Sequence, residues 1–177
     1  IKAYKTHPAF TFGNAELSGI WVGKFETSVN TTSTCYTSNS IANCNLTTLS
    51  IRIKPNVSSW RFATAASFFT TIRNMETTGN IYGYISSEVD THMIKNSEWG
   101  AVAYLSYSIY GKDSEVWINP NSSFITGQAG TSINAATTTT TYTYNNTTYG
   151  INASTTGNVY GIYDMSGGAF EYTMGNI

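Results

Sequence analysis

The chain has 177 residues, with nine Lys and Arg against ten Asp and Glu, and a formal net charge of −1 at pH 7. This balance lacks the basic excess of proteins that bind nucleic acid or an anionic membrane surface. No apolar run approaches the ~20 residues that a membrane-spanning helix needs, so direct membrane insertion by this segment is not expected. The chain has 28 Thr, 20 Ser and 17 Asn but only 11% charged residues, and 14% of its residues are aromatic. This composition favours an extracellular or cell-surface protein with an aromatic core.

Residues 9–28 carry the first β-strand pattern. Ile20 and Val22 alternate with Trp21 and Gly23, which predicts a strand with two packed faces and a close backbone approach at the glycine. The polar loop at 29–50 follows this strand.

The two cysteines of the chain, Cys35 and Cys44, lie in this polar loop. We predict a disulfide between them, with two free thiols as the alternative. Two thiols with no neighbouring His do not make a zinc site, and a redox pair favours a C-x-x-C spacing. A disulfide would indicate an oxidising compartment.

Two segments have helical periodicity. The run from Trp60 to Met75 predicts one helix, capped by Ser58 or Ser59. Within residues 92–105, a second helix is predicted to begin at a cap formed by Asn96 or Ser97, and Gly111 would stop it.

Residues 126–152 form a loop or loose hairpin rich in Thr, Asn and Tyr. Its side chains Tyr142, Tyr144 and Tyr149 are candidate ligand-binding residues, because tyrosine beside serine, glycine and asparagine gives recognition loops contact area and adaptable hydrogen bonds. The alternative is a solvated loop with no binding role.

Four segments in chain order resemble the formylglycine-generating-enzyme (sulfatase-modifying-factor) family. They are Gly19 to Thr27, Pro55 to Trp60 with Ala63, Asn96 to Ala103, and Gly157 to Tyr172. The string Ile94 to Ser106 and the segment Asp164 to Glu171 also resemble a group of bacterial surface proteins that join this domain to a type IV prepilin-like leader helix.

The resemblance implies an α+β chain with an elaborated C-type-lectin-like fold, in which helices are few, strands are short and much of the chain is irregular loop. It implies one domain over residues 1–177 that lacks the family's C-terminal closing region. The aromatic residues Trp21, Trp60, Trp99 and Phe170 are expected to be buried and to set this scaffold.

The resemblance also implies a calcium ion, held by the carbonyl groups of Gly167 and Ala169 and the carboxylate of Glu171. Calcium needs six to eight oxygen ligands, so others would have to join them. The alternative is that Glu171 only caps or pairs locally. Asp164 precedes a turn and is expected to bond backbone N–H groups two residues further on.

The leading functional expectation is a non-catalytic binding or adhesion domain, displayed at the bacterial surface on a pilin-like stalk, whose partner is an extracellular glycan or protein. One alternative is a structural subunit of a pilus-like filament or phage tip. Another is an oxidase of the formylglycine-generating type. No cysteine follows Cys44, so the catalytic cysteines of such an oxidase would have to lie beyond this chain.

Overall fold

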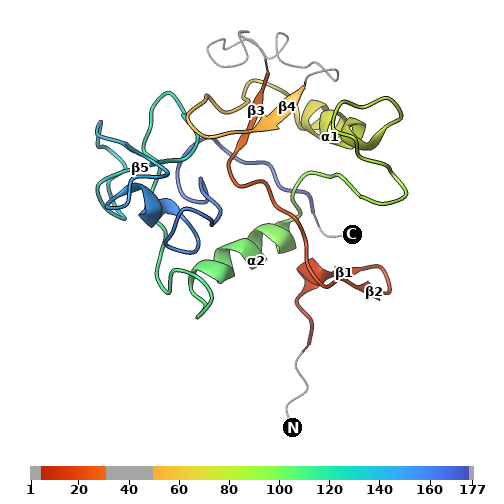
Figure 1. The fold of residues 1–177 in the computed structure, drawn as a ribbon, viewed down its shortest axis with the longest axis horizontal. Coiled ribbons are helices and arrows are strands. Elements are labelled where there is room, and N and C mark those ends of the chain that lie inside the picture. Colours follow the sequence, from red (N-terminus) through yellow and green to blue (C-terminus); the bar gives the residue numbers. More distant parts are fainter. Residues whose placement is uncertain (1–4, 31–49, 176–177) are drawn as a thin grey trace.

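A computed structural model describes residues 5–30 and 50–175. Within these ranges the protein is a small α+β structure, which confirms the expected class of two helices, short strands and long irregular segments. The finer expectation of a C-type-lectin-like fold stays a prediction. Figure 1 shows β3, β4 and α1 at one end, β5 with the neighbouring loops at another, and α2 running across the molecule beneath them.

The strands within the described residues form three separate antiparallel pairs. β1 (Thr11–Phe12) pairs with β2 (Ala15–Glu16), β3 (Thr27–Val29) with β4 (Ile51–Ile53), and β5 (Gln128–Ala129) with β6 (Tyr142–Thr143). Short 3₁₀ helices lie at Pro8–Phe10 (η1), Asn74–Glu76 (η4) and Gly150–Ala153 (η5). A strand with two packed faces was expected around Ile20 and Val22. These residues lie outside any strand, and the next strand after them, β3, begins at Thr27.

Helix α1 spans Ala65–Arg73, so the predicted helix was correctly placed but too long. Phe62 has a left-handed backbone (φ 59°), which ends any continuous helix from Trp60. Thr64 caps the helix instead of Ser58 or Ser59, and its hydroxyl accepts the Ser67 N–H at 3.2 Å. The Ser59 N–H donates to the Phe124 carbonyl at 2.9 Å, outside any helix.

Helix α2 spans Asn96–Ser106 and ends five residues before Gly111. At its start the Glu98 carboxylate accepts the Lys95 backbone N–H at 2.8 Å, which is one half of a capping box. The N-cap position is therefore Lys95 and not the expected Asn96 or Ser97. Glu98 lies in the first turn, where a negative charge is favoured by the helix dipole.

Two clusters form the core. Val29, Ile51 and Trp60 pack with partly buried residues of α1, and Phe25 packs with Ala129, Ala153 and Tyr163. The scaffold prediction was correct for Trp60, which is 5% exposed. It was wrong for Trp21 and Phe170, which are 103% and 101% exposed, because the segments that carry them run over the surface instead of along a packed sheet. Trp99 is half-buried.

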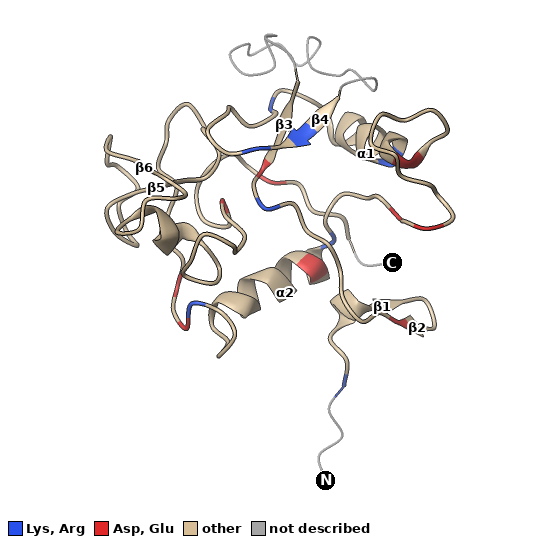
Figure 2. Cartoon of the chain, viewed as in Figure 1, with Lys and Arg blue, Asp and Glu red and all other residues tan. Residues whose placement is uncertain are grey.

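Charges are sparse on this fold (Figure 2). One group of them joins α1 to the segment before α2: Arg73 pairs with Glu76 at 2.7 Å and with Asp90, and His92 lies between Asp90 and Glu98. None of the helices in the described ranges has the length and apolarity to cross a membrane.

Candidate functional site

Two acidic side chains, those of Glu26 and Asp164, meet where the first and last parts of the described chain come together. The Glu26 carboxylate accepts the Ala169 N–H at 2.9 Å and the Ser59 hydroxyl. The Glu26 backbone N–H in turn donates to the Asp164 carboxylate at 3.3 Å. These bonds join the segment before β3 to residues 164–169, about 140 positions further along the chain.

Asp164 holds this junction from inside. Its carboxylate accepts the Asn119 side-chain N–H at 2.9 Å and the Gly127 backbone N–H at 2.9 and 3.0 Å to its two oxygens. The residue is 2% exposed and has a left-handed backbone (φ 63°). The sequence suggested bonds to its own turn, whereas the bonds reach three other segments of the chain.

The electrostatics of the junction favour protonated carboxyl groups. Burial, with repulsion from Asp164, raises the pKa of Glu26 to about 8, although the hydrogen bond from Ser59 opposes that rise. Burial likewise raises the pKa of Asp164 above its ordinary value. Two buried carboxyls that repel one another cannot both ionise without cost, so the junction favours the protonated form of Glu26 at neutral pH.

The turn after Asp164 is shaped by two glycines. Gly167 and Gly168 both have left-handed backbones (φ 77° and 73°). A Cβ atom at Gly167 would lie 2.2 Å from the Asn119 carbonyl oxygen, and one at Gly168 would lie 2.4 Å from a Glu26 carboxylate oxygen. The glycines therefore allow the turn to close directly onto the junction.

Glu171 lies just beyond this turn, and its carboxylate accepts the indole N–H of Trp99 at 2.8 Å. Loss of hydration raises the pKa of Glu171, although the residue as a whole is exposed. Among the expected calcium ligands, Glu171 is the only charged residue. The backbone N–H of Ala169, which is not the expected ligand atom, donates to Glu26. No group of three or more acidic, His or Cys side chains in the described ranges is arranged to hold a metal ion. Calcium binding itself stays a prediction.

The three candidate tyrosines lie in two different environments. Tyr142 and Tyr149 stack on one another, with ring centroids 4.2 Å apart, and Trp117 lies 6.2 Å from Tyr149. Tyr144 instead packs edge-to-face against Phe25 at 5.3 Å and against Tyr163 at 5.8 Å. The structure thus brings Tyr142 and Tyr149 together and places Tyr144 against the core.

A cavity of about 280 Å³ lies in the same region. One wall is the run from Pro120 to Ser123, and the other is formed by residues 136–139 with Thr141, directly before Tyr142. Gly130 lets the walls approach, because a Cβ atom there would lie 3.0 Å from the Cβ of Ala135 and 3.3 Å from the Cγ of Pro120. We call this the threonine cavity. Apart from Pro120 and Ala136, its lining residues carry hydroxyl or amide groups, and none is charged.

Sequence reasoning missed Glu26 and Asn119 as members of the junction. A signal existed for Glu26, since a carboxylate directly beside Phe25 in a strand-like segment needs a partner when buried. Nothing in the sequence pointed to Asn119. Cys35 and Cys44 lie outside the described residues.

Comparisons with known proteins give no further guide. No protein-family model, curated protein or solved structure matches this chain. The functional argument therefore depends on the geometry above.

Proposed function

We propose that the protein is a non-catalytic binding or adhesion domain that acts outside the cell or at the bacterial surface, and that it recognises a neutral glycan. The observation that carries this proposal is the uncharged threonine cavity, whose lining residue Thr141 directly precedes Tyr142 of the stacked pair Tyr142 and Tyr149. The display of the domain on a pilin-like stalk depends only on the family resemblance of the sequence.

The chemistry of the threonine cavity suits a sugar better than an ionic ligand. Sugars present neutral hydroxyl groups, and serine, threonine and asparagine side chains can both donate to such groups and accept from them. A volume of about 280 Å³ lies just below the usual range of small-molecule pockets, roughly 300–1,000 Å³. It can therefore hold one ring of a glycan while the rest of the ligand lies on the surface.

Binding to neutral and charged saccharides by ¹⁵N-detected NMR would test the proposal. Neutral saccharides are expected to shift the resonances of Ser122 and Thr139, and uronic acids are expected to bind more weakly. The variants Ser122→Ala and Thr139→Val remove one hydroxyl each at nearly constant volume and should weaken binding several-fold. Asn121 is unsuitable for this test, because its side-chain oxygen accepts the Ser123 N–H at 3.0 Å and so supports the cavity wall.

Thr147→Val is the matched control, because Thr147 is exposed on the same tyrosine-rich segment but does not line the threonine cavity. Binding should be unchanged in this variant. The proposal would have to be abandoned if no neutral saccharide bound at millimolar concentration, or if all three variants bound alike.

A structural subunit of a filament is the second candidate, and the exposed rings of Trp21 and Phe170 favour it. Fully exposed large aromatic side chains are often found where one protein contacts another. Sedimentation velocity across a concentration series tests this alternative. Self-association that Trp21→Ser or Phe170→Ser removes would support a filament subunit, and a monomer at all concentrations would count against it.

A further inference from the structure

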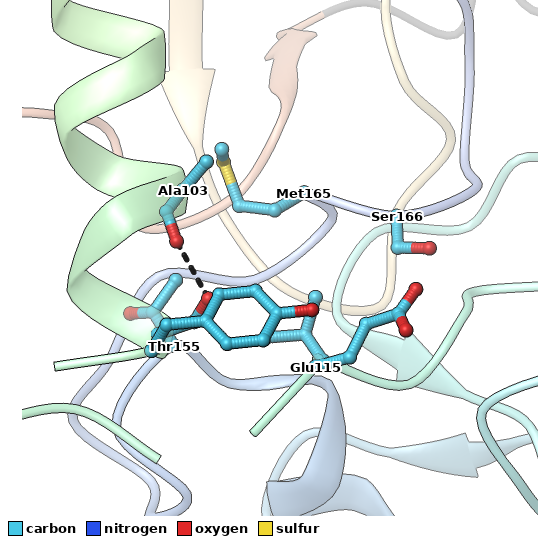
Figure 3. A pocket seen from close by; sticks show the side chains of 8 residues that line it. Ala103, Glu115, Thr155, Met165 and Ser166 are labelled. Carbon is cyan, nitrogen blue, oxygen red and sulfur yellow. Dashed lines mark hydrogen bonds between the residues drawn. The ribbon is translucent and has the colours of Figure 1, made fainter. Parts of the chain in front are cut away.

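A second cavity, of about 200 Å³, opens at the C-terminal end of α2. Ala103, Ser106 and Tyr107 line it from the helix side, and Glu115 and Val116 from the segment that follows. Thr155, Met165 and Ser166 complete it. Figure 3 shows Ala103 on the helix at one side of this cavity and Glu115 with Ser166 at the other.

The residues of the cavity provide acceptors for a cation. Glu115 contributes the only carboxylate, and the lining contains no Lys, Arg or His. The Ser106 hydroxyl donates its proton to the Ala103 carbonyl at 2.6 Å, which leaves the lone pairs of its oxygen to accept. Ser166 adds a further hydroxyl oxygen, whereas the Thr155 hydroxyl oxygen already accepts the Ile162 N–H at 3.1 Å.

The dipole of helix α2 also favours a cation in this cavity. The cavity lies at the C-terminal end of the 11-residue helix α2, where backbone carbonyl groups carry partial negative charge and cations are favoured. The nearest lysine in sequence, Lys112, lies close to Glu115 and is attracted by its charge, but it does not line the cavity. Its ammonium group donates to the backbone carbonyl groups of Glu115 at 2.8 Å and Asn152 at 2.9 Å.

The remaining walls suit an organic cation better than a metal ion. A divalent metal needs several carboxylates or carbonyls around it, and this cavity has one carboxylate. The ring of Tyr107 can face a cation through its π-electrons. Met165 and Val116 provide apolar contact for methylene groups.

From these features we propose that the cavity at the end of α2 binds the alkylammonium end of a lysine side chain from a partner protein. The Glu115 carboxylate pairs with the ammonium, hydroxyl oxygens accept its other protons, and Met165 and Val116 contact the methylene chain. This site is separate from the threonine cavity, so each can fail its test independently of the other.

The test uses the whole chain and Nα-acetyl-lysine N-methylamide as the probe. In ¹⁵N-detected NMR, the probe should shift the resonances of Tyr107, Glu115 and Ser166. The Nε-acetylated form of the probe, which has the same chain without the charge, should cause no shift at equal concentration.

Glu115→Gln should weaken binding of the probe at least tenfold, and Tyr107→Leu should weaken it several-fold. Glu88→Gln is the matched control, because Glu88 is an exposed carboxylate outside the cavity, and binding should be unchanged. Ser122→Ala should also leave it unchanged. Equal binding of the acetylated probe, no effect of Glu115→Gln, or binding of glucosamine or choline in preference to the lysine probe would each overturn the proposal.

Discussion

At the residue scale, the protein depends on backbone conformations that most side chains avoid. Gly167 combines a left-handed backbone with close contact to the Asn119 carbonyl oxygen. Gly79 has a similar backbone (φ 83°), but nothing lies within 4 Å of a Cβ atom placed there. The two positions therefore separate the cost of the backbone conformation from the cost of the steric overlap.

Gly79→Ala is expected to lower the free energy of unfolding by about 1 kcal/mol, the ordinary cost of a left-handed backbone for alanine. Gly167→Ala should lower it by ~3 kcal/mol or more, because the overlap with a backbone oxygen adds to that cost. Urea denaturation of both variants checks this difference. Equal losses would show that the turn can move away from Asn119.

The raised pKa of Glu26 predicts a dependence of stability on pH. Because the pKa is about 8 in the folded protein and near 4.5 when unfolded, folding favours the protonated carboxyl. The contribution to stability is complete below pH 4.5 and is lost as the pH rises to about 8. At pH 7 the loss is on the order of 3 kcal/mol.

Glu26→Gln should remove this loss. The glutamine oxygen can still accept the Ala169 N–H, and its NH₂ group can donate to the Ser59 hydroxyl, which in turn can donate to the Phe124 carbonyl 3.0 Å away. Chemical denaturation between pH 4.5 and 8 should show the variant gaining stability relative to the natural chain as the pH rises. A constant difference across this range would contradict the assigned ionisation, and Glu88→Gln is the control.

At the scale of elements, a group of charged side chains links α1 to the segment that precedes α2. Arg73, at the end of α1, contacts Glu76 and Asp90 and donates to the Thr91 carbonyl at 2.8 Å. Glu76 is only 6% exposed and also accepts the Thr91 backbone N–H at 2.8 Å. The connection from α1 to α2 is thus held by one arginine that neutralises a buried carboxylate.

Arg73→Met should destabilise the protein by ~2 kcal/mol, because it leaves Glu76 buried without its cation. The double variant Arg73→Met with Glu76→Gln should recover part of this loss, since no buried charge then remains. Thermal denaturation of the natural chain and both variants measures the coupling. A double variant no more stable than Arg73→Met alone would contradict the role given to the ion pair.

The sequence predicted an element well where the contacts that determine it lie close together in sequence, and poorly where they lie far apart. Local patterns located both helices, although only α1 is clearly amphipathic. They misplaced the start of α1, because the left-handed backbone of Phe62 and the bond from Ser59 to Phe124 are fixed by distant segments. The exposure of Trp21 and Phe170 was missed for the same reason, since residue type indicates a tendency to be buried and not the path of the chain.

The same distinction between local and distant contacts applies to the candidate site. The Tyr-rich segment and the Gly167–Gly168 turn were visible as composition. The junction was not, because it depends on Glu26 meeting Asp164 and Asn119, which lie far apart in sequence.

At the scale of the whole molecule, the first and last parts of the described chain hold one another. The Lys24 ammonium donates to the Val159 carbonyl, the Tyr163 N–H donates to the Lys24 carbonyl at 2.9 Å, and Glu26 binds Ala169. Phe25 stacks on Tyr163 with ring centroids 5.3 Å apart. The core around Phe25 is therefore incomplete until residues 159–169 are present.

A fragment of residues 1–157 is accordingly expected to lack cooperative unfolding, whereas a fragment of residues 1–175 should retain it. Circular dichroism and amide hydrogen exchange compare the two. Protection of β3 amides in the shorter fragment would show that the first part of the chain folds without the last.

This arrangement also sets the order of events during synthesis on the ribosome. Residues 24–26 emerge well before their partners near 159–169, and closing so long a loop is slow. The nascent chain thus remains without its central contacts until those partners have emerged, in a state that chaperones can bind and that can still be threaded through a narrow pore.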